Sequence, residues 1–179
     1  SEAETSIYLG LFGLIEDGRV YDLKLKNVSI KNKGTTGGMI GEIRGGEILL
    51  EKCMVSGTIT TTSGVTGGLI GTSKSPLVIK DCSNEANIEA TVPTGGLIGE
   101  SRKAIKSIEN SYNLGNIKSS IVGGLIGYIG ESGTEIEYIR NCYNKGSIEG
   151  GSLSGGLIGN TSKVIKSIEN SYNLGNIKT

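Results

Sequence analysis

The sequence predicts an all-β protein: a right-handed parallel β-helix (β-solenoid) of about six coils, with roughly 28–32 residues in each coil. Three observations support this fold. A glycine-rich phrase recurs at a nearly constant spacing, a second phrase follows each copy about ten residues later, and apolar residues fall into columns when the copies are aligned. An internal period of this length is typical of repeat folds in which each unit packs on the next.

The glycine-rich phrase defines the repeat. It is complete in five copies, which lie at 37–41, 67–71, 95–99, 123–127 and 155–159, and a degenerate copy lies at 9–13. We therefore expect coils that start near residues 9, 37, 67, 95, 123 and 155. Residues 1–179 then form a single solenoid domain, which we expect to be a fragment of a longer protein.

The segments between the glycines have the composition of short strands. They are rich in Ile, Val, Thr and Tyr, are separated by Gly, Asn and Ser, and lack a helical apolar period. Glycine at this density would cost a helix about 1 kcal/mol per site. Stacked coils place parallel strands about 4.8 Å apart, and connections between parallel strands are right-handed by default.

Stacking turns the aligned columns into ladders of side chains. The core is predicted from four apolar columns, which contain Leu69, Leu97, Leu125 and Leu157; Ile70, Ile98, Ile126 and Ile158; Ile79, Ile108, Ile139 and Ile168; and Ile88, Ile117, Ile148 and Ile177. Neighbouring residues of a flat strand point to opposite faces. Leu97 and Ile98 therefore leave two arrangements open, an outward ladder or a bend that turns both residues inward, and we favour the bend.

The regular spacing of the glycines along the chain has two interpretations. A phosphate-binding loop requires a following Lys-Ser/Thr and a helix, and the chain has neither in the required frame. We therefore expect structural glycines, which either adopt a positive φ or allow close approach of backbone. They are Gly38, Gly41, Gly68, Gly71, Gly96, Gly99, Gly124, Gly127, Gly156 and Gly159.

The second phrase contributes two polar columns. Asn84, Asn113, Asn144 and Asn173 predict a structural ladder in which amides bond to one another and to turn backbone. Tyr112, Tyr143 and Tyr172 are the best candidates for binding, because an outward aromatic strip suits sugars or protein partners. The alternative is a ladder that only protects the sheet, and this structural interpretation is favoured.

The three cysteines fall in one column with Ser111 and Ser171. Cys53 and Cys82 lie in adjacent coils, so a disulfide is conceivable, whereas Cys142 has no neighbouring cysteine. Parallel Cβ vectors disfavour the bond, and free buried thiols are the expectation.

The pattern resembles the GLUG-motif family, which is named for a Gly-Leu-hydrophobic-Gly core. The residues that carry the resemblance are Gly68-Leu69-Ile70-Gly71 and its equivalents at 38–41, 96–99, 124–127 and 156–159, with the Asn-Cys/Ser-Tyr-Asn phrase that follows. The family occurs in large secreted and surface proteins of bacteria, including adhesin-like proteins and the non-catalytic parts of IgA-specific metallopeptidases. The resemblance implies a β-helical stalk or adhesive module at the bacterial surface or outside the cell.

The composition excludes several functions. With 18 basic and 18 acidic residues the formal charge is zero, which argues against nucleic-acid binding, and the apolar runs are too short for membrane insertion. The absence of histidine removes Ser-His, Cys-His and most zinc chemistry. An acidic insert with Glu131, Glu135 and Glu137 could bind a cation, but a solvated loop is favoured. We therefore expect no metal and no cofactor.

The predicted function is non-catalytic: a stiff stalk or binding surface in a bacterial surface or secreted protein. The expected partners are a host glycan or surface protein, neighbouring domains of the same chain, and further copies that stack end to end. Two alternatives stay open. One is a carbohydrate-active β-helix enzyme, which requires converging carboxylates. The other is a specific module that binds a host glycan or protein through the tyrosines.

Overall fold

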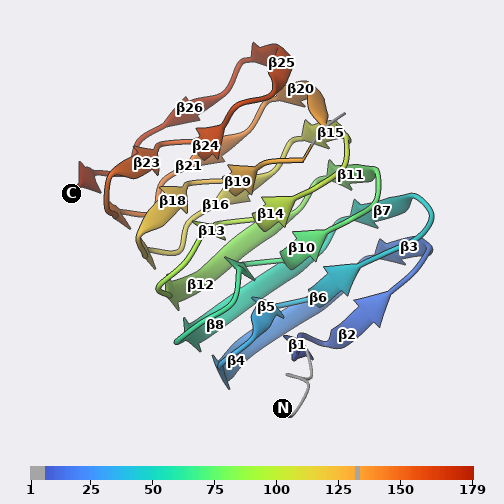
Figure 1. Cartoon of the computed structure of the whole chain (residues 1–179), viewed down its shortest axis with the longest axis horizontal. Coiled ribbons are helices and arrows are strands. Elements are labelled where there is room, and N and C mark those ends of the chain that lie inside the picture. Colours follow the sequence, from blue (N-terminus) through green and yellow to red (C-terminus); the bar gives the residue numbers. More distant parts are fainter. Residues whose placement is uncertain (1–6, 132–133) are drawn as a thin grey trace.

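The computed structural model describes residues 7–131 and 134–179, and this part of the chain folds as one stack of short strands (Figure 1). Strands that occupy the same place in successive coils pair in parallel and form four sheets, here called A, B, C and D. Leu and Ile side chains of sheets B, C and D pack with Val122 of sheet A in one buried core. The predicted β-solenoid is therefore confirmed.

The strands are short and follow each other in the same order in every coil. Sheet A contains β1 (Tyr8–Leu9), β5 (Thr35–Gly37), β9 (Thr66–Gly67), β13 (Thr94–Gly95), β18 (Ile121–Gly123) and β23 (Leu153–Gly155). Sheet B contains β2 (Phe12–Ile15), β6 (Ile40–Ile43), β10 (Ile70–Ser73), β14 (Ile98–Ser101), β19 (Ile126–Ile129) and β24 (Ile158–Thr161). Sheet C contains β3 (Gly18–Tyr21), β7 (Ile48–Glu51), β11 (Leu77–Lys80), β15 (Ile105–Glu109), β20 (Glu135–Arg140) and β25 (Val164–Glu169).

Sheet D changes along the stack. Its first three coils contribute one long strand each, β4 (Lys24–Asn32), β8 (Met54–Thr61) and β12 (Ser83–Glu89). The last three contribute two short ones each, β16 (Tyr112–Asn113) and β17 (Ile117–Lys118), β21 (Tyr143–Asn144) and β22 (Ile148–Glu149), and β26 (Tyr172–Asn173) and β27 (Ile177–Lys178). The break falls on Leu114-Gly115-Asn116 and its equivalents, because glycine and asparagine favour turns over continuous strand.

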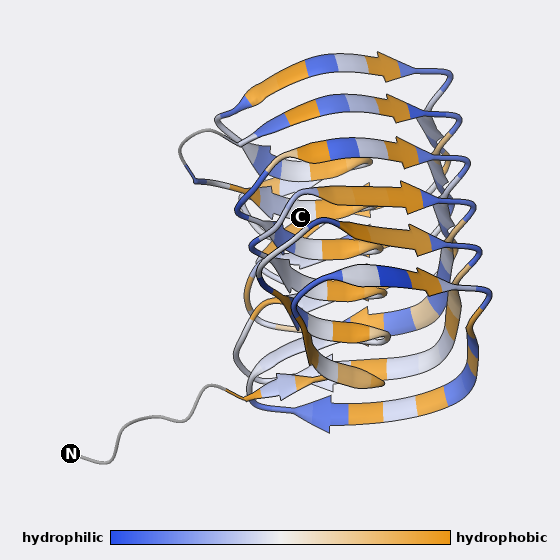
Figure 2. Cartoon of the chain, turned by 90° about the vertical axis from the view of Figure 1, so that its right-hand side faces the viewer, coloured by the Kyte–Doolittle hydropathy of each residue, from blue (hydrophilic) through white to orange (hydrophobic). Residues whose placement is uncertain are grey.

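The described residues make six coils, which comprise β1–β4, β5–β8, β9–β12, β13–β17, β18–β22 and β23–β27 and are numbered 1 to 6 below. Figure 2 shows sheet C toward the viewer, with its strands running from left to right, and the stack rises from β3 to β25 (Figures 1 and 2). A near face that runs to the right while the chain climbs defines a right-handed coil, as the sequence predicted.

The core consists of the predicted apolar columns in the predicted register. In sheet C, Ile79 pairs with Ile108 and Ile108 with Ile139. In sheet D, Ile88 pairs with Ile117, and Ile117 with Ile148. All six of these side chains are at most 2% exposed. Each fully buried Ile contributes about 1.5–3 kcal/mol, so the ladders are the main stabilising feature of the rod.

A bend at each Gly-Leu pair explains how two consecutive apolar residues both reach the core. Strand β9 ends at Gly67 and β10 begins at Ile70, so Leu69 lies in the corner between sheets A and B. Leu69 and Ile70 are both fully buried. Their amides donate to the same acceptor, Leu97 O of the next coil, at 3.0 and 2.9 Å. The favoured bend is confirmed.

The glycines of the motif are needed for close approach and not for an unusual φ. Within residues 7–131 and 134–179, positive φ at glycine occurs only at Gly18, Gly45, Gly57 and Gly64, none of which belongs to the motif. A Cβ on Gly68 would lie 2.1 Å from the carbonyl oxygen of Gly96 in the next coil. The positive-φ interpretation of these glycines is therefore wrong, and the close-approach interpretation holds.

The corner between sheets C and D is formed by a residue with a positive φ. One residue per coil adopts the left-handed conformation, with φ between 47° and 55°: Asp22, Lys52, Asp81, Asn110, Asn141 and Asn170. Asp and Asn tolerate this region better than other side chains. The next residue of each coil belongs to the Cys/Ser column.

The Cys/Ser column accepts hydrogen bonds from backbone. Cys82 N donates to Ser111 Oγ, and Cys142 N donates to Ser171 Oγ, both at 3.0 Å. Cys53 N donates to Cys82 Sγ at 3.4 Å, so sulfur and oxygen serve the same role. The three cysteines are free and buried, as expected. Burial raises the pKa of Cys142 to about 11.

Candidate binding surface

A ladder of buried asparagines lies directly beneath the outer surface of sheet D. Asn84, Asn113 and Asn144 are fully buried, and each Nδ2 donates to Oδ1 of the asparagine in the next coil at 2.7 Å. Each Nδ2 also donates to a carbonyl two residues further along its own coil, at 2.7–2.9 Å. The ladder thus satisfies backbone where sheet D breaks, and it fixes the residue on either side of each asparagine.

The tyrosines stand next to the asparagines and point outward. Tyr112 pairs with Tyr143 and Tyr143 with Tyr172 in the strand register. The ring centroids are 4.8 and 5.4 Å apart, and the ring planes differ by 1° and 8°. The structure therefore brings together all three tyrosines that the sequence singled out. Burial, and then the neighbouring Tyr112 and Tyr172, raise the pKa of Tyr143.

Stacking limits what the tyrosines can offer to a partner. Because the rings face each other at the strand spacing, their inner faces are covered by one another. The strip presents ring edges and hydroxyl groups along its length, and a free ring face only at its two ends. Hydroxyl groups and aromatic edges suit hydrogen-bonding, amphipathic partners.

The rest of the outer face of sheet D is mostly polar, with two exposed leucines, and repeats with the same spacing. Its outward columns are Glu85, Leu114, Lys145 and Leu174; Asn87, Asn116 and Ser147; and Glu89, Lys118, Glu149 and Lys178. The last two columns, apart from Lys178, line an open groove of about 540 Å³. We call the tyrosines together with these three columns the tyrosine face.

Charges alternate in sign along the outermost column of the tyrosine face. Lys118 Nζ lies 2.7 Å from Glu149 Oε1. This contact raises the pKa of Lys118 and lowers the pKa of Glu149. Both side chains are more than half exposed, so the pair stabilises the fold little. Lys145 Nζ lies 5.1 Å from the centre of the Tyr143 ring, which adds a cation next to the aromatic strip.

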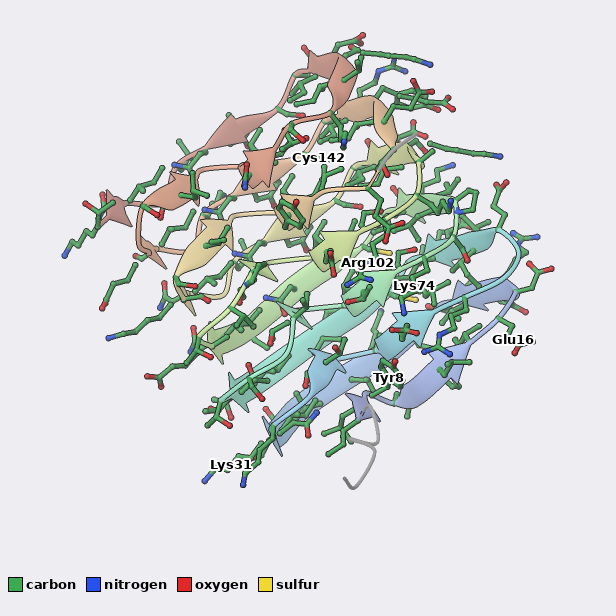
Figure 3. The ribbon with its side chains drawn as sticks, in the orientation of Figure 1. Tyr8, Glu16, Lys31, Lys74, Arg102 and Cys142 are labelled. Carbon is green, nitrogen blue, oxygen red and sulfur yellow. The ribbon has the colours of Figure 1, made fainter. Side chains whose placement is uncertain are left out.

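Sheet B carries a second group of charged residues that the sequence analysis missed. Glu42 and Glu100 occupy equivalent positions on either side of Thr72, and both are at least 90% buried. They line an open pocket of about 720 Å³ with Lys74 and Arg102. Figure 3 shows Tyr8, Lys74 and Arg102 on this side of the rod. The signal in the sequence is that both glutamates directly follow a glycine phrase.

Each buried glutamate has a basic neighbour. Glu42 is paired with Arg44 and with Lys74, whose Nζ lies 3.1 Å from Glu42 Oε2. Arg102 Nε lies 3.1 Å from Glu100 Oε1. Glu100 Oε2 has no hydrogen-bond partner among the described residues. The two carboxylates thus converge on one pocket, but Glu42 is already neutralised by two cations.

The residues present do not suggest a metal site. Among the residues that the structure describes, no group of three His, Cys, Asp or Glu side chains is placed to hold a metal ion. In the acidic insert, Glu131 lies 3.7 Å from Arg102 and Glu135 lies 2.7 Å from Lys166. Residues 132–133 of the insert lie outside the described residues.

No helix in the described part of the chain is long and apolar enough to cross a membrane. In comparisons with known proteins, no family model, no curated protein and no solved structure matches the chain. The resemblance to GLUG repeats stays a prediction that rests on the residues quoted for it.

Proposed function

We propose that the chain is a non-catalytic structural and adhesive repeat module of a bacterial cell-surface or secreted protein. In this role it acts as a stiff stalk that displays the tyrosine face. The observation that carries the proposal is the rigid pairing of an outward Tyr ladder with a buried Asn ladder over three coils. A surface whose side chains are already ordered loses little conformational entropy on binding.

The proposed partners are a host glycan or a host surface protein on the tyrosine face, and neighbouring domains at the ends of the rod. End-to-end association of copies is part of the proposal. In coil 6, Ile168 is 42% exposed, whereas its partner Ile139 in coil 5 is fully buried. Sedimentation velocity at increasing protein concentration tests this part; a single monomeric species at all concentrations contradicts it.

The adhesive role is tested by binding to immobilised glycans and extracellular-matrix proteins. The variant replaces Tyr112, Tyr143 and Tyr172 with Ala, and the matched control is Tyr21→Ala, since Tyr21 is 65% exposed and lies outside the ladder. We expect the triple variant to lose binding and the control to retain it, with both far-ultraviolet circular dichroism spectra unchanged. Retained binding by a folded triple variant contradicts the proposal.

A second candidate function is a carbohydrate-active enzyme of β-helical fold. The convergence of Glu42 and Glu100 on one pocket favours it, because glycoside hydrolysis uses paired carboxylates. We rank it below the adhesive role because Glu42 is held by Arg44 and Lys74. The test is release of reducing ends from a polysaccharide panel: activity that Glu100→Gln abolishes supports the enzyme, and no activity on any member rejects it.

A further inference from the structure

The tyrosine ladder ends abruptly between coils 4 and 3. Tyr112 in coil 4 pairs with Ser83 in coil 3, and Ser83 pairs with Met54 in coil 2. The column therefore changes from three aromatic rings to a small hydroxyl side chain within one strand spacing.

This change leaves one face of the Tyr112 ring without an aromatic neighbour. The Tyr112 and Tyr143 rings are parallel and their centroids are separated by 4.8 Å, which is the spacing of the coils. The other face of Tyr112 is therefore directed toward coil 3, where the column holds Ser83, a much smaller side chain that is 6% exposed. Tyr112, Ser83 and Met54 all line the same open pocket of about 450 Å³.

The rim of this pocket is charged but balanced. It contains three basic side chains, Lys24, Lys26 and Lys52, and three carboxylates, Asp22, Asp81 and Glu85. A flat, purely apolar occupant would remove these groups from water without replacing their hydrogen bonds, which is unfavourable. A ring with one apolar face and hydroxyl groups at its edge meets both requirements, since it stacks on Tyr112 and bonds with the rim.

We propose that the step between Tyr112 and Ser83 is a binding site for one neutral pyranose ring of a glycan. The sugar lies with its C–H face on Tyr112, in the place of a fourth rung, and its hydroxyl groups bond with the carboxylates and ammonium groups of the rim. A neutral sugar is specified because the rim carries equal numbers of positive and negative groups. This inference rests on the proposed adhesive function and names its ligand class.

The most direct test fills the proposed binding site with an aromatic side chain. Ser83→Tyr extends the ladder by one ring and occupies the site, whereas Ser83→Ala leaves the site open. Tyr112→Ala removes the platform. Tyr21→Ala is the matched control, because Tyr21 is 65% exposed and lies outside the ladder. The probes are maltose, cellobiose, lactose and N,N′-diacetylchitobiose, followed by saturation-transfer NMR and titration, with thermal unfolding to verify each fold.

We expect at least one probe to bind, and we expect Ser83→Tyr and Tyr112→Ala to weaken that binding about tenfold or more, because they block or remove the stacking contact. Ser83→Ala and Tyr21→Ala should change it less than about twofold. The proposal is overturned if no probe binds at millimolar concentration, if folded Ser83→Tyr binds like the unmodified chain, or if Tyr21→Ala loses as much binding as Tyr112→Ala.

The outcome separates this proposal from the broader one. Suppose that Ser83→Tyr has no effect while the triple tyrosine variant loses binding to the glycan or matrix panel. The proposed pyranose site between Tyr112 and Ser83 is then wrong, and the proposed adhesive role of the tyrosine face is retained. If an aromatic peptide, and none of the four sugars, competes at the step, the ligand class is wrong.

Discussion

Coils 4 and 6 contain the same fourteen residues, at 105–118 and 165–178, in two different environments. Both stretches form the same strands at matching positions. Yet Ile108 is fully buried and Ile168 is 42% exposed, and Ile117 is 2% exposed while Ile177 is 45% exposed. Local sequence is thus sufficient for the path of a coil, whereas burial depends on a coil stacked on either side. Stability should therefore follow nearest-neighbour contacts, as in other repeat proteins.

The largest expected difference between the two coils concerns isoleucine. Ile108→Ala should lower the free energy of unfolding by about 3–4 kcal/mol, because it removes a fully packed side chain and leaves a cavity. Ile168→Ala should lower it by only about 1 kcal/mol, since solvent already reaches that side chain. Urea denaturation followed by circular dichroism measures both. Equal losses would show that stacking does not set the difference.

The asparagine ladder should give a smaller difference. Asn113 accepts from Asn84 and donates to Asn144, whereas Asn173, in coil 6, accepts from Asn144 and donates to no asparagine among the described residues. Asn113→Ala should cost about 2–3 kcal/mol because it leaves buried amide groups without partners. Asn173→Ala should cost about 1 kcal/mol. The same denaturation experiment applies, and a larger loss at Asn173 would contradict the account.

The difference in stability between the tyrosine variants should be smaller than that between the asparagine variants. Tyr143 stacks on two rings and Tyr172 on one. Each stacked pair contributes about 0.5–1.5 kcal/mol beyond burial. Tyr143→Ala should therefore destabilise by about 1 kcal/mol more than Tyr172→Ala. Thermal unfolding of the two variants checks this order, and near-ultraviolet circular dichroism should lose more intensity for Tyr143→Ala.

The smallest effect concerns pH. The pKa of Tyr143 is raised by burial and by its two neighbouring rings, so the folded chain favours the neutral phenol. Its stabilising contribution is complete below the pKa of an unfolded tyrosine, about 10. It is lost as pH rises past that value, because the unfolded chain releases the proton first. Tyr143→Phe should flatten this loss in denaturation series between pH 9 and about 11; an unchanged slope would contradict the assignment.

Much of the fold follows directly from the sequence, because a stacked repeat converts sequence columns into spatial neighbours. Ile79, Ile108 and Ile139 pair as the alignment of copies predicts. The asparagines and tyrosines also occupy single ladders. In such a fold the period alone fixes the register, so few other contacts need to be known.

The features that the sequence does not predict depend on where side chains point and on the backbone conformation at the corners between sheets. The left-handed corner escaped notice because Lys52 occupies it alongside Asp81 and Asn110, which hides the column. Glu42 and Glu100 were missed because a carboxylate after a glycine phrase has no reason to be buried until a basic neighbour is seen. Because Tyr112 stacks on Tyr143, the ring face that is free to contact a ligand lies at the end of the ladder, which the sequence alone does not show.

The most direct test of the central claim is amide hydrogen exchange of the two identical stretches, resolved residue by residue with NMR. Equal sequences have nearly equal intrinsic exchange rates, so differences report structure alone. In the monomeric chain, Asn110 N and Ile117 N donate to coil 5 at 3.1 and 2.9 Å, whereas the equivalent amides of Asn170 and Ile177, in coil 6, make no such bond among the described residues. We predict protection of Asn110 and Ile117 at least roughly 100-fold above that of Asn170 and Ile177, with Tyr112 and Tyr172, which both donate to the preceding coil, much closer to each other. Equal protection of the two stretches at every amide would contradict the account.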